Sequence, residues 1–184
     1  MITVNPNPAP VVTISMANDT ICRFDTLNLT ASGASTYQWS TPANPNLSTS
    51  ATATDVPLNT TTYTVVGTDA LGCPSQPTTQ TIVVGRRPTI NAFNNSNATV
   101  CSGGSSTLTV NATSGVGGGG GGGVTLAYQW NPNVGTTNTV TVSPTVTTLY
   151  TVTVVGQFGC STTDTTTVNV NPNAISPIIS VTPD

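Results

Sequence analysis

The 184-residue sequence contains no lysine, no glutamate and no histidine, and only 5% of its residues are charged. Soluble globular domains carry about 25% charged residues. Without histidine and lysine the chain cannot form a Ser/His/Asp triad, a histidine metal cluster, a lysine nucleophile or a phosphate-binding loop. The side chains that normally act as general bases are also missing. We therefore predict that the protein is not an enzyme and has no catalytic or cofactor-binding residues.

Positive charge is especially scarce, because only Arg23, Arg86 and Arg87 carry it. A nucleic-acid reader needs many basic contacts to phosphate, so no nucleic-acid partner is expected. The six aspartates are scattered along the chain without the pairing that acid/base catalysis requires. Calcium at a joint between domains is the one cofactor that the composition allows, through carboxylates and backbone carbonyls, but no EF-hand or tandem aspartate motif is present. No metal ligands are predicted.

Long apolar runs are also missing. No stretch of about 18 apolar residues occurs, so no membrane span is expected. The first residues, from Met1 to Pro6, have neither the basic region nor the apolar region of a signal peptide. If the protein is exported, its export signal is expected to lie outside this sequence.

The residues that are abundant, threonine and valine above all, favour β-strands, because β-branched side chains suit a pleated surface. Apolar and polar residues alternate in several short runs. Leu27, Leu29 and Ala31 fall on one face of such a run, and Asn28 and Thr30 fall on the other. Proline, glycine and asparagine clusters separate the runs, at the spacing of a sandwich with about seven strands per repeat. No segment shows a helical period.

The sequence is a tandem duplication, because several landmarks return in the same order about 80 to 90 residues later. These landmarks are Cys22 and Cys101, Tyr37–Trp39 and Tyr128–Trp130, Tyr63 and Tyr150, and Gly72–Cys73 and Gly159–Cys160. We predict repeats over residues 9–86 and 87–171. Residues 1–8 resemble the tail of a preceding repeat or a linker, and residues 172–184 resemble the first strand of a following one, which a neighbouring subunit could also borrow.

Four aromatic residues occupy positions typical of a sandwich core. Trp39 and Trp130 each lie between the two cysteines of their repeat, where an immunoglobulin-like domain keeps its core tryptophan. Tyr63 and Tyr150 stand where such a domain begins its sixth strand. We predict that all four are buried, rather than forming a platform for a ligand. The predicted fold is all-β, with two tandem immunoglobulin-like β-sandwich domains.

The four cysteines predict disulfides, because CxxC spacing and histidine are absent and small domains with modest cores depend on such bonds in oxidising compartments. Pairing of Cys22 with Cys73 and of Cys101 with Cys160 is favoured, since each repeat would then fold autonomously. In an immunoglobulin topology, however, these partners fall near opposite poles. Pairing of Cys22 with Cys160 is therefore the alternative.

A run of glycines, Gly117 to Gly123, precedes Tyr128 in the second repeat, and the first repeat has no counterpart to it. It satisfies a glycine-rich phosphate-binding pattern trivially, but no strand and helix flank it and no lysine follows. We interpret the run as a flexible insertion.

The ordered motifs of the repeats suggest a family. A cysteine, then Leu-x-Leu-Thr-Ala-Ser-Gly, Tyr-Gln-Trp, Thr-Thr-Thr-Tyr-Thr-Val and Asp-x-x-Gly-Cys follow one another. This order resembles the immunoglobulin-like and PKD-like repeats of Bacteroidetes surface adhesins, a class that includes gliding-motility proteins and type IX secretion substrates. The second repeat departs from it, with Gln-Phe-Gly-Cys in place of the aspartate motif. The resemblance implies export to the cell surface, an array or filament architecture, adhesion, and O-glycosylation at Thr20, Thr26 and Thr165.

Together these features predict a non-catalytic structural and adhesive repeat module of an extracellular surface protein or filament. Its expected partners are copies of itself and surface glycans or a host or substratum. The alternative is a carbohydrate-binding or spacer module of a secreted enzyme, which would need an exposed aromatic platform.

Overall fold

The computed structural model describes residues 8–115 and 125–171. The expectations for residues 1–7, for the glycine run Gly117 to Gly123 and for the strand predicted within 172–184 lie outside the described residues. Contacts divide the chain into two compact units. Within the described residues, unit 1 comprises 8–87, 114–115 and 156–160, and unit 2 comprises 88–113, 125–155 and 161–171. The repeat boundaries drawn from the sequence remain predictions.

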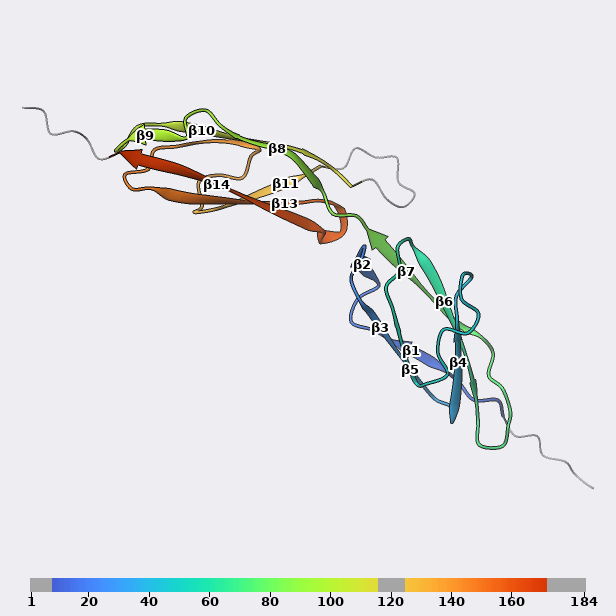
Figure 1. Cartoon of the computed structure of the whole chain (residues 1–184). Coiled ribbons are helices and arrows are strands. Elements are labelled where there is room, and N and C mark those ends of the chain that lie inside the picture. The colour runs from blue at the N-terminus through green and yellow to red at the C-terminus, as the bar shows by residue number, and fades with distance from the viewer. Residues whose placement is uncertain (1–7, 116–124, 172–184) are drawn as a thin grey trace, which may run out of the picture. The chain divides into compact units, whose positions relative to one another are not determined.

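Unit 1 is a β-sandwich of two sheets (Figure 1). Its strands are β1 (Thr13–Ser15), β2 (Thr20–Cys22), β3 (Leu27–Ser32), β4 (Thr36–Ser40), β5 (Thr52–Asp55), β6 (Thr61–Thr68) and β7 (Thr78–Gly85). One sheet has the order β1-β3-β5 and the other the order β2-β7-β6-β4. All neighbouring strands are antiparallel except the short β2, which runs parallel to the end of β7.

Unit 2 repeats this arrangement. Its strands are β8 (Thr89–Asn95), β9 (Thr99–Cys101), β10 (Ser106–Thr113), β11 (Ala127–Asn131), β12 (Thr139–Val142), β13 (Thr148–Val155) and β14 (Ser161–Asn171). The sheet orders are β8-β10-β12 and β9-β14-β13-β11, and β9 is again parallel to the last strand. A short 3-10 turn, η1 (Gln157–Gly159), separates β13 from β14. The all-β prediction is therefore confirmed.

Alternation along the strands builds each core. In β3, Leu27, Leu29 and Ala31 are buried and the residues between them are exposed, as the sequence pattern predicts. They pack against Trp39 of β4 and Val65 of β6, which belong to the other sheet. The core of unit 1 thus lies between its two sheets. An equivalent cluster fills unit 2.

Both tryptophans lie inside these cores. Trp39 is 0% exposed and its Nε1–H donates to the Ser50 carbonyl at 3.1 Å; Trp130 is 5% exposed and donates to the Thr137 carbonyl at 2.9 Å. The Phe93 ring meets Trp130 edge-on, with ring centroids 5.6 Å apart. Each indole therefore has its one polar group satisfied and its faces covered.

Acrylamide should consequently quench the tryptophan fluorescence of the native protein weakly. We expect the quenching constant to rise several-fold in guanidinium, because unfolding exposes both indoles to the quencher. A Trp130→Phe variant reports Trp39 alone and should behave in the same way. Native quenching as strong as that of the unfolded chain would contradict the buried positions.

Tyr63 and Tyr150 lie on β6 and β13 and are 0% and 4% exposed. The Tyr63 hydroxyl donates to Asp55 Oδ2 at 2.6 Å. Burial, the hydrogen bond and the negative charge of Asp55, in that order, hold the pKa of Tyr63 well above its ordinary value of 10. The phenol therefore stays protonated in the folded state at pH values where the unfolded chain loses the proton.

Unit 1 should lose stability in alkali for this reason. Below pH 10 both states keep the Tyr63 proton, whereas above it the unfolded state releases the proton and the folded state does not, so the free energy of unfolding falls as the pH rises. Thermal melts at pH 8.5 and pH 11.5 should show the fall, and Tyr63→Phe should show a smaller one. An equal pH dependence in that variant would assign the effect to other groups.

Candidate functional site

One disulfide joins Cys22 to Cys160, with Cα atoms 5.6 Å apart and a sequence separation of 138. Cys22 is the last residue of β2, and Cys160 directly follows η1. The sequence places Cys160 in the second repeat, but its contacts place residues 156–160 in unit 1. The sulfur of Cys160 is shielded from solvent, since the residue is 0% exposed.

The favoured pairing of Cys22 with Cys73 was wrong, and the register of β2 explains why. Cys22 lies opposite Gly85 at the end of β7, while Cys73 precedes the start of the same strand at Thr78. At about 3.3 Å per residue, β7 alone separates these points by roughly 23 Å. A disulfide needs Cα atoms within about 7 Å.

The pairing of Cys101 with Cys160 was wrong for the same reason. Cys101 lies opposite Asn171 at the end of β14, and Cys160 directly precedes Ser161 at its start. The length of β14 therefore holds the two cysteines roughly 33 Å apart, at about 3.3 Å per residue. In each sequence repeat the two cysteines lie at opposite ends of the last strand, so a disulfide between the two cysteines of one repeat cannot form.

Gly85 is the residue against which the bonded loop packs. A Cβ placed on Gly85 would lie 2.9 Å from Cys160 Sγ and 3.1 Å from Cδ2 of Phe158. Such distances are shorter than van der Waals contact allows, so any larger residue would displace the loop. The glycine at the end of β7 thus makes room for η1 and the disulfide.

The same parallel pairing brings the arginines together. Arg23 follows β2 and Arg86 follows β7, and because Cys22 lies opposite Gly85 the two residues leave the sheet at the same end. The Arg23 amide donates to the Gly85 carbonyl at 2.8 Å. Arg23, Phe24, Arg86 and Arg87 line one open pocket of about 220 Å³. Every basic residue of the sequence therefore lines a single pocket.

Within this pocket, which we call the arginine pocket, Arg87 is held in place. It donates from Nη2 to Asp25 Oδ1 at 2.7 Å and from Nη1 to the Arg23 carbonyl at 3.0 Å. Both charged side chains are almost half exposed, so this ion pair contributes about 1 kcal/mol or less to stability. Its main effect is to fix the direction of the Arg87 guanidinium.

Arg23 and Phe24 lie against each other in the same pocket. The Arg23 guanidinium lies 5.0 Å from the centre of the Phe24 ring. Arg23 Nε is buried and has no hydrogen-bond partner among the described residues. Phe24 is 68% exposed and has a φ of 73°, in the left-handed region. Sequence reasoning counted the three arginines but missed their convergence, because the parallel pairing of β2 and β7 is a contact between distant segments.

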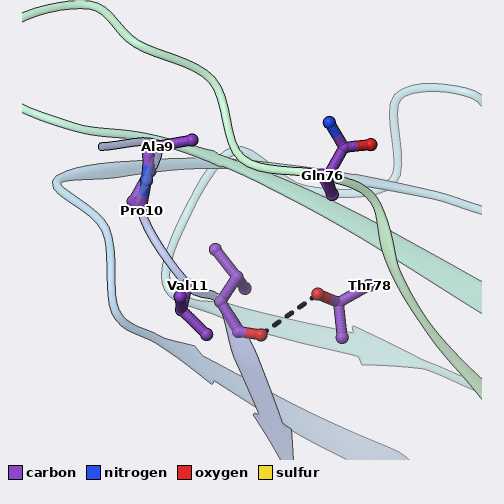
Figure 2. A pocket seen from close by; sticks show the side chains of 6 residues that line it. Ala9, Pro10, Val11, Gln76 and Thr78 are labelled. Carbon is purple, nitrogen blue, oxygen red and sulfur yellow. Dashed lines mark hydrogen bonds between the residues drawn. The ribbon is translucent and has the colours of Figure 1, made fainter. Parts of the chain in front are cut away.

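A second hollow of about 230 Å³ lies at the start of β1, lined by Ala9, Pro10, Val11, Val12, Gln76 and Thr78. The Thr78 hydroxyl donates a hydrogen bond of 3.1 Å to the Val12 carbonyl, which is the dashed line that starts at Thr78 in Figure 2. The lining holds no titratable side chain. This hollow therefore offers no chemistry beyond packing.

The three threonines of the predicted O-glycosylation motifs differ in exposure. Thr26 and Thr165 are exposed, and Thr20 is half-buried on β2, where its hydroxyl donates to Asp19 Oδ1 at 3.2 Å. Among the described residues no group of three or more Cys and Asp side chains is placed to hold a metal ion. Over the same residues, no helix has the length and apolar character of a membrane span.

No protein-family model and no curated protein matches the sequence. Solved structures do match. Fibronectin(III)-like modules of Clostridium thermocellum CbhA are 13% identical over 88% of this chain and 95% of theirs, with a TM-score of 0.50. The N-terminal eight Ig domains of Down Syndrome Cell Adhesion Molecule are 14% identical, with a TM-score of 0.52, and the match covers 90% of this chain but only 24% of that one.

The chain is built of immunoglobulin- and fibronectin-like β-sandwiches. At these identities the likeness shows the fold alone. In both units the first two strands belong to different sheets, and the second of them, β2 or β9, pairs in parallel with the last strand.

Proposed function

We propose that this chain is a non-catalytic structural and adhesive repeat module of an extracellular surface protein or filament. The observation that carries the proposal is the Cys22–Cys160 disulfide. Disulfides persist in oxidising compartments such as the cell exterior, and they are rare in reducing ones. Tandem sandwiches with a covalent link of this kind suit a stalk that must resist extension and proteolysis.

The link changes the path along which tension travels. Force applied to the two ends of the chain passes through the disulfide from Cys22 to Cys160. The chain between the two cysteines, which are separated by 138 in sequence, therefore does not extend. A disulfide within one repeat would protect that repeat only. The observed bond instead protects most strands of both.

The surface of the sandwiches supports contact between copies. Hydroxyl groups pair across strands, as between Thr62 and Thr81 at 2.8 Å and between Thr13 and Ser32 at 2.8 Å. Such pairs keep the surface of the sheet polar without adding charge. With a net charge of −3 over 184 residues, neighbouring copies repel one another weakly, which favours association.

The turns that carry the cysteines recur in both repeats. After Cys22, the Asp25 amide donates to the Cys22 carbonyl at 2.9 Å, and after Cys101 the Gly104 amide donates to the Cys101 carbonyl at 2.7 Å. The turn ending at Cys73 resembles the turn ending at Cys160: in each, the first amide of the turn donates to the carbonyl of its cysteine, at 3.1 and 2.8 Å respectively. Cys101 is exposed. We propose that the exposed Cys101 thiol links one copy of the chain to another through a disulfide.

Oxidation of the purified chain tests this array. Two thiols would lose two protons and two electrons to glutathione disulfide, leaving one intermolecular disulfide and two glutathione thiols. Nonreducing electrophoresis should show disulfide-linked copies that Cys101→Ser abolishes. Electron micrographs of the oxidised material should show linear particles. Isolated monomers after oxidation would refute the array.

The carbohydrate-binding alternative cannot use the tryptophans. Trp39 and Trp130 are 0% and 5% exposed, so neither forms an aromatic platform. If the module contacts glycans, it must do so through other residues.

A further inference from the structure

The arginine pocket concentrates positive charge in a nearly uncharged protein. Three arginines line it and one of them, Arg87, pairs with the Asp25 carboxylate, whereas the whole chain carries a net charge of −3. Stability does not require this arrangement, because an exposed ion pair contributes little. We propose that the arginine pocket binds the carboxylate or sulfate group of an acidic polysaccharide.

Guanidinium chemistry fits such a ligand. Arginine presents paired N–H donors that match the two oxygens of a carboxylate or sulfate. Arg87 is already oriented by Asp25, so less freedom is lost when the ligand binds.

Phe24 gives the second argument, because its backbone conformation favours glycine. The corresponding turn of unit 2 has Gly103 at this point, with a φ of 79° against 73° for Phe24. A side chain in the left-handed region destabilises the fold, because its Cβ comes too close to the following carbonyl oxygen. The chain thus places an exposed aromatic ring beside the arginines at a cost in stability. The ring offers an apolar face on which the C–H groups of a sugar can lie.

The number of charges selects the class of ligand. A nucleic acid is held through many phosphates, and an anionic membrane attracts clusters of four to eight basic residues. This sequence has three arginines and no lysine. It can therefore hold one acidic group at a time, and the adjacent ring favours a sugar over an aspartate or glutamate side chain of a peptide.

Binding of short oligosaccharides to the purified chain tests the proposal. The probes are an oligogalacturonate, a chondroitin sulfate oligosaccharide, a neutral maltooligosaccharide of equal length and an oligo-aspartate peptide. We expect calorimetry to show binding of one or both acidic saccharides, weakening as salt is added, and no binding of the neutral one. The acidic probe that binds identifies the carboxylate or the sulfate as the ligand group.

Two variants assign the binding to the pocket. Arg86→Gln removes one guanidinium and should weaken binding at least tenfold. Phe24→Gly removes the ring while relieving the backbone, so it should fold at least as stably as the parent and still bind several-fold more weakly. Unfolding curves confirm that both variants are folded.

The proposal fails if neither acidic saccharide binds, or if Arg86→Gln binds as tightly as the parent. Equal affinity for the oligo-aspartate peptide, unchanged by Phe24→Gly, would overturn the saccharide assignment in favour of an acidic protein partner. None of these results depends on whether copies of the chain form an array.

Discussion

Reduction of the Cys22–Cys160 disulfide should lengthen the fully stretched protein by about 480 Å when it is pulled from its two ends. The sequence separation between the cysteines is 138, and each residue step adds roughly 3.5 Å once the bond is broken. With the bond intact, tension never reaches those residues, so strands β3 to β13 remain outside the stretched path. Single-molecule force spectroscopy with and without a thiol reductant measures the difference directly.

Two cysteine variants make this experiment specific. Cys22→Ser should show the long extension without reductant, because the bond cannot form. Cys101→Ser should keep the short extension, since Cys101 lies outside the bond. A long extension for the oxidised parent protein would show that force reaches the segment between the cysteines and would remove the basis of the proposed mechanical role.

Leu29→Ala should lower the free energy of unfolding of unit 1 by about 2 to 5 kcal/mol. Leu29 is 1% exposed between the two sheets, so the substitution removes buried methyl groups and leaves a cavity. For a domain of this size each kcal/mol shifts the melting temperature by about 4 to 8 °C. Calorimetry should therefore show one transition moved down by at least about 8 °C.

Leu71→Ala is the matched control, because Leu71 is 76% exposed and the chemical change is identical. It should change stability by less than about 0.5 kcal/mol, as surface substitutions usually do. The transition of unit 2 should stay in place in both variants if the units unfold independently. Similar destabilisation by the two substitutions would mean that β3 does not face the core.

The strands of this fold could be predicted from the sequence because each is a local pattern. The alternation in Leu27–Ser32 is enough to place a half-buried strand, and the duplication repeats the evidence. The pairing of β2 with β7 could not be predicted in this way, because it joins residues about 60 positions apart and β2 has only three residues. No periodicity marks so short a strand.

Because the pairing of β2 with β7 was not predicted, two errors were made at the site, one about the disulfide and one about the arginine pocket. Pairing within each repeat was favoured on the assumption that repeats fold autonomously, although the immunoglobulin topology already placed those partners near opposite poles, and the structure has the alternative, Cys22 with Cys160. The arginine pocket was missed because Arg23 and Arg86 meet only through the pairing of β2 with β7. The best signal in the sequence was Gly85, a glycine ending an otherwise β-branched run just before two arginines.

The position of Cys160 also orders the events by which the protein matures. During synthesis or export from the N-terminus, Cys22 emerges long before its partner and meets Cys73 first. Only a chain that has already paired β2 with β7 keeps those two thiols apart. A first sandwich that folds before oxidation therefore reserves Cys22 for Cys160, because its topology holds Cys22 and Cys73 at opposite ends of β7.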